Sequence, residues 1–227
     1  MTINPGNVDT VVLDIDGTLV DSNYHHTIAW GRAFRRLGHV VPHWRIHRCI
    51  GMGGDRLVPA VTDEDTAARI GAEVKERWER GYDAMIDQTR LFAGARELLD
   101  GLRATGVEVV LASSSIPKHA EHALRLLRAD ERADAWTTSE DAEESKPHPE
   151  LLDKAMERVA ASRALMIGDA PWDVVAARQR RIPTIGLRCG GFGADELSGA
   201  GAVAVYDDPA DLLDHLDEAL AEAARHP

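Results

Sequence analysis

Two aspartates directly follow a short apolar run near the start of the chain. Residues 11–13 are valine, valine and leucine, which is typical of a strand buried on both faces, and Asp14, Asp16 and Gly17 follow closely. Because side chains alternate along a strand, both aspartates leave its end toward the same side, and Gly17 allows a sharp turn. A divalent cation or a shared proton would relieve the repulsion between the two carboxylates. The alternative is a turn in which the aspartates only cap a helix.

Other polar residues follow further expected strands. Ser113 follows the apolar run 107–112, Asp169 comes just after the run 164–167, and Lys146 lies in a polar loop. A parallel sheet brings the ends of such strands together along one edge. Carboxylates gathered there suit Mg²⁺, and a hydroxyl group with a lysine suits a phosphoryl group. Ser113 alone is equally consistent with a helix cap and Lys146 alone with a surface charge, so the chemical interpretation depends on their occurring together.

The order of the expected elements predicts an α/β fold. Strands alternate with helices from residue 91 onward, which favours a Rossmann-like, mostly parallel sheet with helices on both faces. The preceding span has helical periodicity and no convincing strand, and it far exceeds the roughly 30 residues of an ordinary crossover. We therefore expect a core of residues 1–20 and 91–227 and an inserted, all-helical cap of residues 21–90. The cap would lie over the sheet edge that carries the polar residues.

The expected boundaries follow from periodicity and from capping residues. Helices are expected at residues 23–37, 63–85, 94–105, 117–127, 149–159, 172–179 and 209–224, and strands at 107–112, 135–138, 164–167, 182–187 and 202–205. Ser22 is the expected cap of the first of these helices.

Composition narrows the range of partners. The formal net charge of −12 argues against nucleic acid, and a small phosphorylated metabolite would have to be attracted by local features. No apolar run reaches the length of a membrane span, and residues 1–10 show no signal-peptide pattern. With only Cys49 and Cys189 present, we expect a cytoplasmic protein whose cysteines are packing residues. The sequence does not indicate an oligomeric state.

Four motifs together resemble those of the haloacid dehalogenase (HAD) superfamily. They are Asp14-Ile15-Asp16-Gly17-Thr18, Ser113, Lys146-Pro147, and Gly168-Asp169 with Asp173 four residues further on. The motifs occur in the family's order, and the resemblance covers nearly the whole chain. The insertion between the first two motifs resembles the C1 helical cap of the phosphoglycolate phosphatase and β-phosphoglucomutase-like subfamily.

The resemblance implies a division of roles among the acidic residues. Asp14 would be the nucleophile that forms an aspartyl-phosphate, and Asp16 the general acid and then the general base. Asp16 must then hold a proton in the first step, which a neighbouring carboxylate would favour. Mg²⁺ would be bound by Asp14, by the backbone carbonyl of Asp16 and by Asp169, with Asp173 supporting the metal site.

The resemblance also implies which residues bind the phosphoryl group. Ser113, the backbone of Ser114 and Lys146 would hold its oxygens and offset developing charge. Thr18, in the first motif, is expected to contact substrate as well. The implied function is an Mg²⁺-dependent phosphatase that hydrolyses a small phosphate monoester.

Single residues argue against two other activities of the superfamily. Asp16 argues against a haloacid dehalogenase, which needs no acid at that position. A phosphonatase uses a cap lysine, and Lys75, the only lysine in residues 20–90, is expected to lie away from the glycine-rich turn.

A sugar phosphomutase is the principal alternative. Residues 24–30 resemble the segment that follows the first motif in β-phosphoglucomutase, with His26 approaching the site. However, Gly54 and Ile116 stand where the mutase pattern carries a phosphate-binding arginine and lysine. A non-catalytic protein that binds a phosphorylated ligand is a further alternative, although no catalytic residue is missing.

Substrate contacts from the cap are expected around the glycine-rich turn at residues 49–57. The expected contact residues are His26, His47, Arg48, Met52 and Arg56. Trp30 and Trp44 are expected to be packing residues. Closure of the cap would exclude water during phosphoryl transfer.

Overall fold

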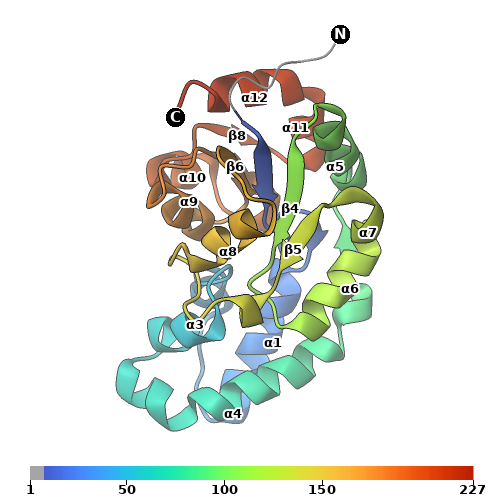
Figure 1. Ribbon diagram of the computed structural model, residues 1–227. Coiled ribbons are helices and arrows are strands. Elements are labelled where there is room, and N and C mark those ends of the chain that lie inside the picture. Colours follow the sequence, from blue (N-terminus) through green and yellow to red (C-terminus); the bar gives the residue numbers. More distant parts are fainter. Residues whose placement is uncertain (1–7, 227) are drawn as a thin grey trace.

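A six-stranded parallel sheet forms the centre of the molecule (Figure 1). The computed structural model describes residues 8–226. In spatial order the strands are β5 (Ala135–Thr137), β4 (Glu108–Ala112), β1 (Thr10–Leu13), β6 (Ala164–Gly168), β7 (Thr184–Leu187) and β8 (Ala204–Tyr206). Leu13 of β1 pairs with Leu111 of β4 on one side and with Ile167 of β6 on the other. The three strands therefore end level with one another, at the point where the strand order reverses.

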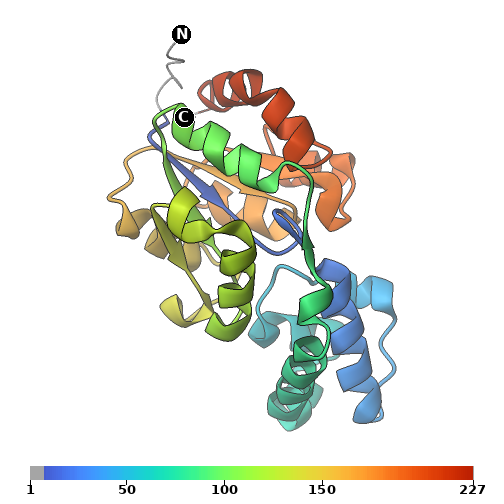
Figure 2. The same ribbon diagram turned by 90° about the vertical axis from the view of Figure 1, so that its right-hand side faces the viewer.

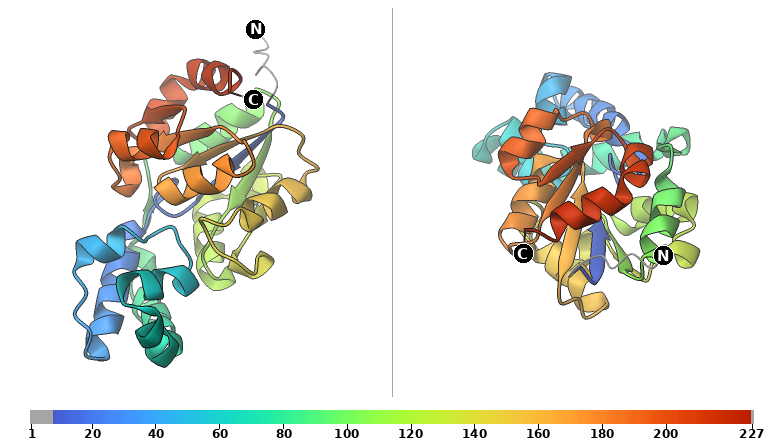
Figure 3. Two further views of the ribbon diagram at one scale, coloured as in Figure 1. Left: turned by 90° about the vertical axis from the view of Figure 1, so that its left-hand side faces the viewer. Right: turned by 90° about the horizontal axis from the view of Figure 1, so that it is seen from above.

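Helices cover both faces of the sheet because its strands are apolar on both sides (Figures 1 and 3). Val11 and Leu13 pack into one hydrophobic cluster, and Val12 packs into another on the opposite face. The first face is covered by α5 (Ala95–Ala104), α6 (Pro117–Leu127), α7 (Ala129–Arg132), α11 (Pro209–Asp214) and α12 (Leu216–Ala223). The second face is covered by α8 (Glu150–Arg158), α9 (Pro171–Arg178) and α10 (Ala194–Ala200). The expected α/β fold is confirmed.

The long span after β1 forms a separate helical unit beyond the ends of the strands (Figure 2). It consists of α1 (Asn23–Arg36), α2 (His43–His47), α3 (Gly54–Val61), α4 (Glu64–Asp83) and the 3₁₀ turn η1 (Ile86–Gln88). Phe34, Leu57 and Val74 are the centre of its own hydrophobic cluster, distinct from those of the sheet. The unit therefore carries a core of its own above the expected site.

Two short strands connect this unit to the sheet, where the sequence predicted none. Val20 of β2 (Val20–Asp21) pairs antiparallel with Leu91 of β3 (Arg90–Leu91). Two residues are too few to show any periodicity, so the prediction was wrong at both ends of the span.

Residues 8–226 contain no helix with the length and apolar character to cross a membrane.

The C-terminal helical segment also differs from its prediction. A single helix was expected over residues 209–224, but His215 has non-helical backbone angles (φ −115°, ψ 19°) and separates α11 from α12. The remaining differences are short elements for which no bounds were predicted: α2, α3, α7, α10 and the 3₁₀ turns η1, η2 (Ser139–Asp141) and η3 (Arg188–Gly190). The other expected helices and strands are present, with ends that shift by up to a few residues.

Candidate active site

The ends of β1, β4 and β6 bring the expected polar residues to one edge of the sheet. Asp14 follows β1, Ser113 follows β4 and Asp169 follows β6. Asp14, Lys146 and Asp169 are only 4%, 4% and 1% exposed. Charged side chains are rarely buried to this degree without partners, so their contacts indicate what the site can do.

Lys146 lies between two carboxylates. Its Nζ is 2.6 Å from Oδ1 of Asp14 and 2.6 Å from Oδ1 of Asp173. Burial lowers the pKa of Lys146, but the two carboxylates outweigh burial and raise the pKa above its usual value. Asp173 is fixed in turn because its Oδ2 accepts a hydrogen bond of 3.1 Å from the backbone N–H of Ala170. Lys146 is therefore a buried cation of the site and not a surface charge.

Three carboxylates form a buried cluster. One oxygen from each of Asp14, Asp169 and Asp173 lies within 4.8 Å of the others. Burial, opposed by Lys146 and reinforced by Asp173, raises the pKa of Asp14 to about 7. Burial and the neighbouring carboxylates likewise raise the pKa of Asp169. One lysine does not balance three crowded carboxylates, so this hard, oxygen-rich set fits a divalent cation such as Mg²⁺.

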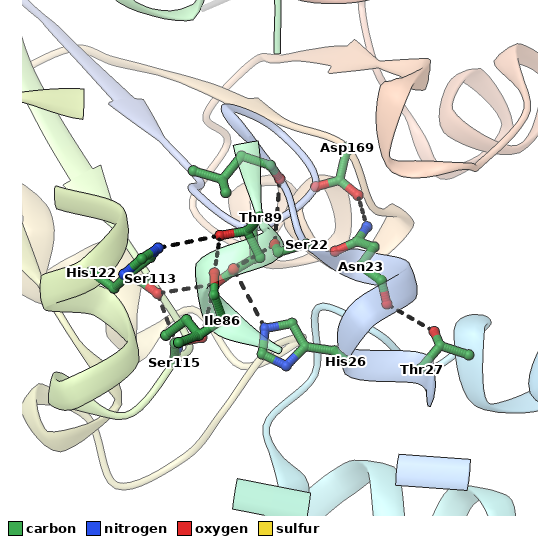
Figure 4. Close-up of polar contacts among 12 residues, drawn as sticks. Ser22, Asn23, His26, Thr27, Ile86, Thr89, Ser113, Ser115, His122 and Asp169 are labelled. Carbon is green, nitrogen blue, oxygen red and sulfur yellow. Dashed lines mark hydrogen bonds and ion pairs between the residues drawn. The ribbon is translucent and has the colours of Figure 1, made fainter. Parts of the chain in front are cut away.

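Asp169 accepts hydrogen bonds from two side chains that lie between the end of β1 and the start of α1. Thr18 Oγ1 donates to Oδ1 of Asp169 at 2.9 Å. Asn23 Nδ2 donates to Oδ2 of the same carboxylate at 2.8 Å (Figure 4). Thr18 is fully buried and supports this carboxylate, although the sequence placed it against substrate. Gly17 has a φ of +81°, and a Cβ there would overlap the Asn23 amide and approach Oδ2 of Asp169 to 2.5 Å. Only glycine leaves room for this contact.

Asp16 is surrounded by hydrogen-bond donors. Its carboxylate accepts from Ser22 Oγ at 2.6 Å and from Ser115 Oγ at 2.8 Å, and His26 Nε2 lies 3.5 Å away. Figure 4 shows Ser22, His26, Ser113 and Ser115 gathered where the helical unit meets the sheet. Burial raises the pKa of Asp16, but the hydrogen bonds from His26, Ser22 and Ser115 outweigh burial and place the pKa below its usual value. In this arrangement the donors around Asp16 favour its ionised form, opposite to the protonated form that the resemblance requires in the first step.

The side chains of Ser22 and Ser113 make contacts that the sequence did not predict. Ser22 precedes α1 but makes no capping hydrogen bond through its side chain, which is engaged with Asp16. Ser113 is fully buried, and its Oγ accepts a hydrogen bond of 3.0 Å from the backbone N–H of Ser115. Ser113 therefore shapes the loop after β4. Ser113 Oγ also donates to Oδ2 of Asp16 at 3.5 Å, and its expected contact with a phosphoryl group stays a prediction.

A small cavity of about 60 Å³ lies against the two aspartates, and we call it the inner cavity. The core contributes Asp14, Asp16, Ser114 and Ser115 to its lining, and the helical unit contributes His26, Trp30, Ile50, Gly51, Met52, Gly53, Gly54 and Trp78. Lys146, Asp169 and Asp173 do not line this cavity, and Lys146 reaches it only through its contact with Asp14. Asp14 and Asp16 therefore face the helical unit across the inner cavity.

Only His26 and Met52 of the expected contact residues line the inner cavity. His47 Nε2 lies 2.9 Å from the carbonyl oxygen of Gly190. Arg48 is paired with Glu196 at 2.5 Å, and Arg56 with Glu144 at 2.6 Å.

His47, Arg48 and Arg56 instead make contacts that join the helical unit to the core. Periodicity places residues on a helix but does not say which acidic group of a distant loop will pair with an arginine. The prediction of a substrate contact at Arg56 is therefore not supported by its position.

His26, Trp30 and Trp78 form an aromatic wall of the inner cavity, and the sequence did not predict how these rings stack. His26 stacks on Tyr82 with ring centroids 3.8 Å apart, and Trp30 stacks on Trp78 at 4.8 Å. His26 and Trp30 are four residues apart on α1, as are Trp78 and Tyr82 on α4, and this spacing was the available signal. Trp44, by contrast, is 70% exposed and is not a packing residue.

Comparison with known proteins agrees with this geometry. A haloacid dehalogenase-like hydrolase model matches residues 8–179, and a HAD-hydrolase-like model matches residues 144–219. The chain belongs to the haloacid dehalogenase-like hydrolase family. A hydrolase from Pseudomonas syringae of known structure is 35% identical, with a TM-score of 0.87 over 92% of this chain and 98% of that one.

Two curated relatives of this HAD hydrolase are named as phosphatases. Validoxylamine A 7'-phosphate phosphatase from Streptomyces hygroscopicus subsp. limoneus is 31% identical and aligns over 78% of this chain and 84% of its own. Phosphoglycolate phosphatase from Nitrosospira multiformis is 30% identical, with 77% and 80% covered. The chain is a phosphatase of the phosphoglycolate phosphatase and β-phosphoglucomutase-like subfamily.

Proposed function

We propose that this HAD hydrolase is an Mg²⁺-dependent enzyme that hydrolyses a small phosphate monoester through an aspartyl-phosphate on Asp14. The observation that carries the proposal is the position of Asp14. It faces the inner cavity, is paired with Lys146 at 2.6 Å, and shares a buried cluster with Asp169 and Asp173.

Asp14 is suited to be the nucleophile. Lys146 holds Oδ1, and the hydrogen bonds among residues 8–226 leave Oδ2 without a donor. Oδ2 attacks phosphorus, a bond forms between them, and the bond from phosphorus to the leaving oxygen breaks. Water then attacks the same phosphorus and releases inorganic phosphate and free Asp14. Fixing the carboxylate before substrate arrives reduces the entropic part of both barriers.

Asp16 is the proposed proton donor and acceptor. A substrate dianion next to Asp16 raises the pKa of this carboxyl by charge repulsion, which opposes the donors that lower it in the free protein. Asp16 then gives a proton to the leaving oxygen and takes one from the attacking water. Ser22 and Ser115 orient the carboxylate for both transfers.

The metal would be bound by Asp14, Asp169 and the backbone carbonyl of Asp16, with Asp173 supporting the site. When bound, it would neutralise charge between Asp14 and the phosphoryl oxygens. Lys146 and the loop of Ser113 and Ser114 provide further positive charge and N–H donors to those oxygens.

Residues 21–90 are proposed to act as a cap domain over a core of residues 1–20 and 91–227. The separate hydrophobic cluster around Phe34 and the paired strands β2 and β3 support this division. The proposed role of the cap is to exclude bulk water from the inner cavity while the phosphoryl group is transferred to Asp14. The expected setting is cytoplasmic, with a small phosphorylated metabolite as substrate.

His26 lies 3.5 Å from Asp16, as the mutase alternative expects, but the two positions that carry cations in the mutase pattern argue against it. Gly54 and Ile116 both line a cavity next to the aspartates, and neither carries a positive charge. Lys75, which the sequence placed far from the glycine-rich turn, in fact lies beside it, with Cε 3.3 Å from the position of a Cβ on Gly54. It does not line the inner cavity, so the arrangement does not favour a phosphonatase either.

Phosphate release from an aryl phosphate tests the proposed function. We expect release with Mg²⁺, none with EDTA, and recovery when Mg²⁺ is restored. Interconversion of glucose 1-phosphate and glucose 6-phosphate without phosphate release would replace the proposal with the mutase. Absence of turnover across a broad panel of phosphate esters would replace it with the binding protein.

A further inference from the structure

A larger cavity of about 390 Å³ adjoins the inner cavity, and we call it the outer cavity. Both cavities are lined by Trp30, Gly53, Gly54, Trp78 and Ser114. The outer cavity is bounded by α3 and α4 on one side and by the loops at residues 114–116 and 139–145 on the other. A phosphoryl group bound at Asp14 would therefore place its leaving group toward the outer cavity.

The charged residues of the outer cavity are mostly acidic. They are Asp55, Glu76, Glu79, Glu143 and Glu144, with Lys75 as the single cation in the lining. Glu144 is paired with Arg56 at 2.6 Å and Glu76 with Arg80 at 2.7 Å, which offsets part of this charge. Glu79 and Glu143 have no ion-pair partner in the part of the chain that the structure describes. Such a cavity disfavours a leaving group that carries a carboxylate or a second phosphate.

The junction of the two cavities carries polar atoms that lack partners. Trp78 Nε1 and Ser114 Oγ are buried and form no hydrogen bond within residues 8–226. Trp78 also stacks on Trp30 with an angle of 11° between the rings, which gives the lining a broad aromatic component. Buried donors without partners and an aromatic surface suit a ligand that offers hydroxyl oxygens together with a cation.

We propose that the outer cavity selects phosphate monoesters whose leaving group carries a protonated amine together with hydroxyl groups. This inference rests on the proposed function, because it assumes that the phosphoryl group binds at Asp14. Glu79 and Glu143 pair with the ammonium group, and Trp78 adds attraction through its ring and donates to a hydroxyl oxygen. Amino sugar and amino alcohol phosphates have this chemistry.

The test compares phosphate esters that differ in leaving-group charge. In the first pair, glucosamine 6-phosphate carries an ammonium group where glucose 6-phosphate carries a hydroxyl group. In the second pair, phosphoethanolamine carries an ammonium group where phosphoglycolate carries a carboxylate. We expect kcat/KM to be roughly tenfold higher for the amine in the first pair and more in the second. Equal values, or a preference for the hydroxyl or the carboxylate, would overturn the inference.

The same comparison is made by binding, so that it does not depend on turnover. Dissociation constants of glucosamine 6-phosphate and glucose 6-phosphate are measured by calorimetry on the Asp14→Asn variant. A lower Kd for the amine supports the inference, and equal constants overturn it. If an aryl phosphate is not hydrolysed by the wild-type protein while the amine still binds more tightly, the proposed function fails and the inference about the cavity stands.

Substitutions locate the source of the preference. The Glu79→Gln and Glu143→Gln double variant is expected to reduce the amine preference by roughly fivefold or more, and added salt to weaken it in the wild-type protein. The Glu73→Gln and Glu218→Gln double variant, an equal change of charge at two exposed residues outside the cavity lining, is expected to leave the preference unchanged. If the double variant loses activity equally on both members of each pair, the two glutamates do not recognise the amine and the inference is overturned.

Discussion

Asn23 Nδ2 donates a hydrogen bond of 2.8 Å to Asp169 Oδ2, although 146 residues of chain separate the two. The same amide also donates to the carbonyl oxygen of Gly190 at 3.0 Å. Asn23 is the first residue of α1, and Asp169 follows β6, so the contact joins the start of the helical unit to a carboxylate of the buried cluster. The orientation of a proposed metal ligand therefore depends on where α1 begins.

Asn23→Ala is expected to weaken Mg²⁺ binding. Asp169 loses one of the two donors that fix its orientation, and removing a partner of this kind typically costs about tenfold or more in metal affinity. The measurement is the Mg²⁺ dependence of phosphate release. Thr27→Val is the control, because Thr27 donates to the carbonyl oxygen of Asn23 and does not contact Asp169. Identical Mg²⁺ titrations for Asn23→Ala and the wild type would contradict the prediction.

Asp14→Asn is expected to reduce phosphate release by at least about 10³-fold, because an amide is a far weaker nucleophile. The fold should persist, since Lys146 keeps its pairing with Asp173 at 2.6 Å. Circular dichroism and the unfolding midpoint check the fold while phosphate release checks activity. The matched control is Asp21→Asn, an exposed carboxylate on β2, which should retain wild-type turnover. Appreciable activity in Asp14→Asn would remove Asp14 as the nucleophile.

Sequence reasoning predicted the residues whose positions depend on topology. Asp14 and Asp169 each follow an apolar run, and parallel pairing of those runs brings them together whatever the intervening sequence. The same argument predicted an α/β core and a helical insertion. Lys146 is different, because it lies in a long loop after β5 and no strand end fixes its position, so its interpretation depended on its occurring with the other polar residues.

The contacts that the sequence did not predict depend on packing. Asn23 and Ser22 lie at the start of an amphipathic helix, and the direction of their side chains depends on how α1 meets the sheet. Arg56 was expected to bind substrate, but a glutamate 88 residues away takes its guanidinium group. The stacked pair Trp30 and Trp78 required knowing that α1 and α4 lie side by side.

Without metal, folding stability is expected to fall as the pH rises from about 4 to about 7. The pKa of Asp14 is about 7 in the folded protein against 3.8 as its reference value, so the folded state binds more protons in this window. Asp169 shifts in the same direction. Urea unfolding in EDTA near pH 5 and near pH 7 measures the effect. Asp14→Asn should show a smaller fall, and an equal fall in both proteins would exclude Asp14 as a source.

Mg²⁺ should reverse this loss. The metal binds ionised carboxylates, so its stabilising effect should be larger near pH 7 than near pH 5. At a concentration about 100 times its Kd, it adds roughly 2.7 kcal/mol to the free energy of unfolding. The shift in unfolding midpoint on adding Mg²⁺ at each pH is the measurement. A shift that does not change with pH would place the metal away from Asp14 and Asp169.

Lys146→Met is expected to lower the free energy of unfolding at neutral pH by about 3–5 kcal/mol, because Asp14 and Asp173 remain buried without their counter-charge. Lys154→Met is the control, since Lys154 forms a surface pair with Glu157 at 3.2 Å whose loss costs at most about 1 kcal/mol. Urea unfolding compares the two variants. Saturating Mg²⁺ should recover part of the loss in Lys146→Met, because the cation replaces the missing charge beside Asp14. Equal destabilisation in both variants would mean that the buried carboxylates do not depend on Lys146.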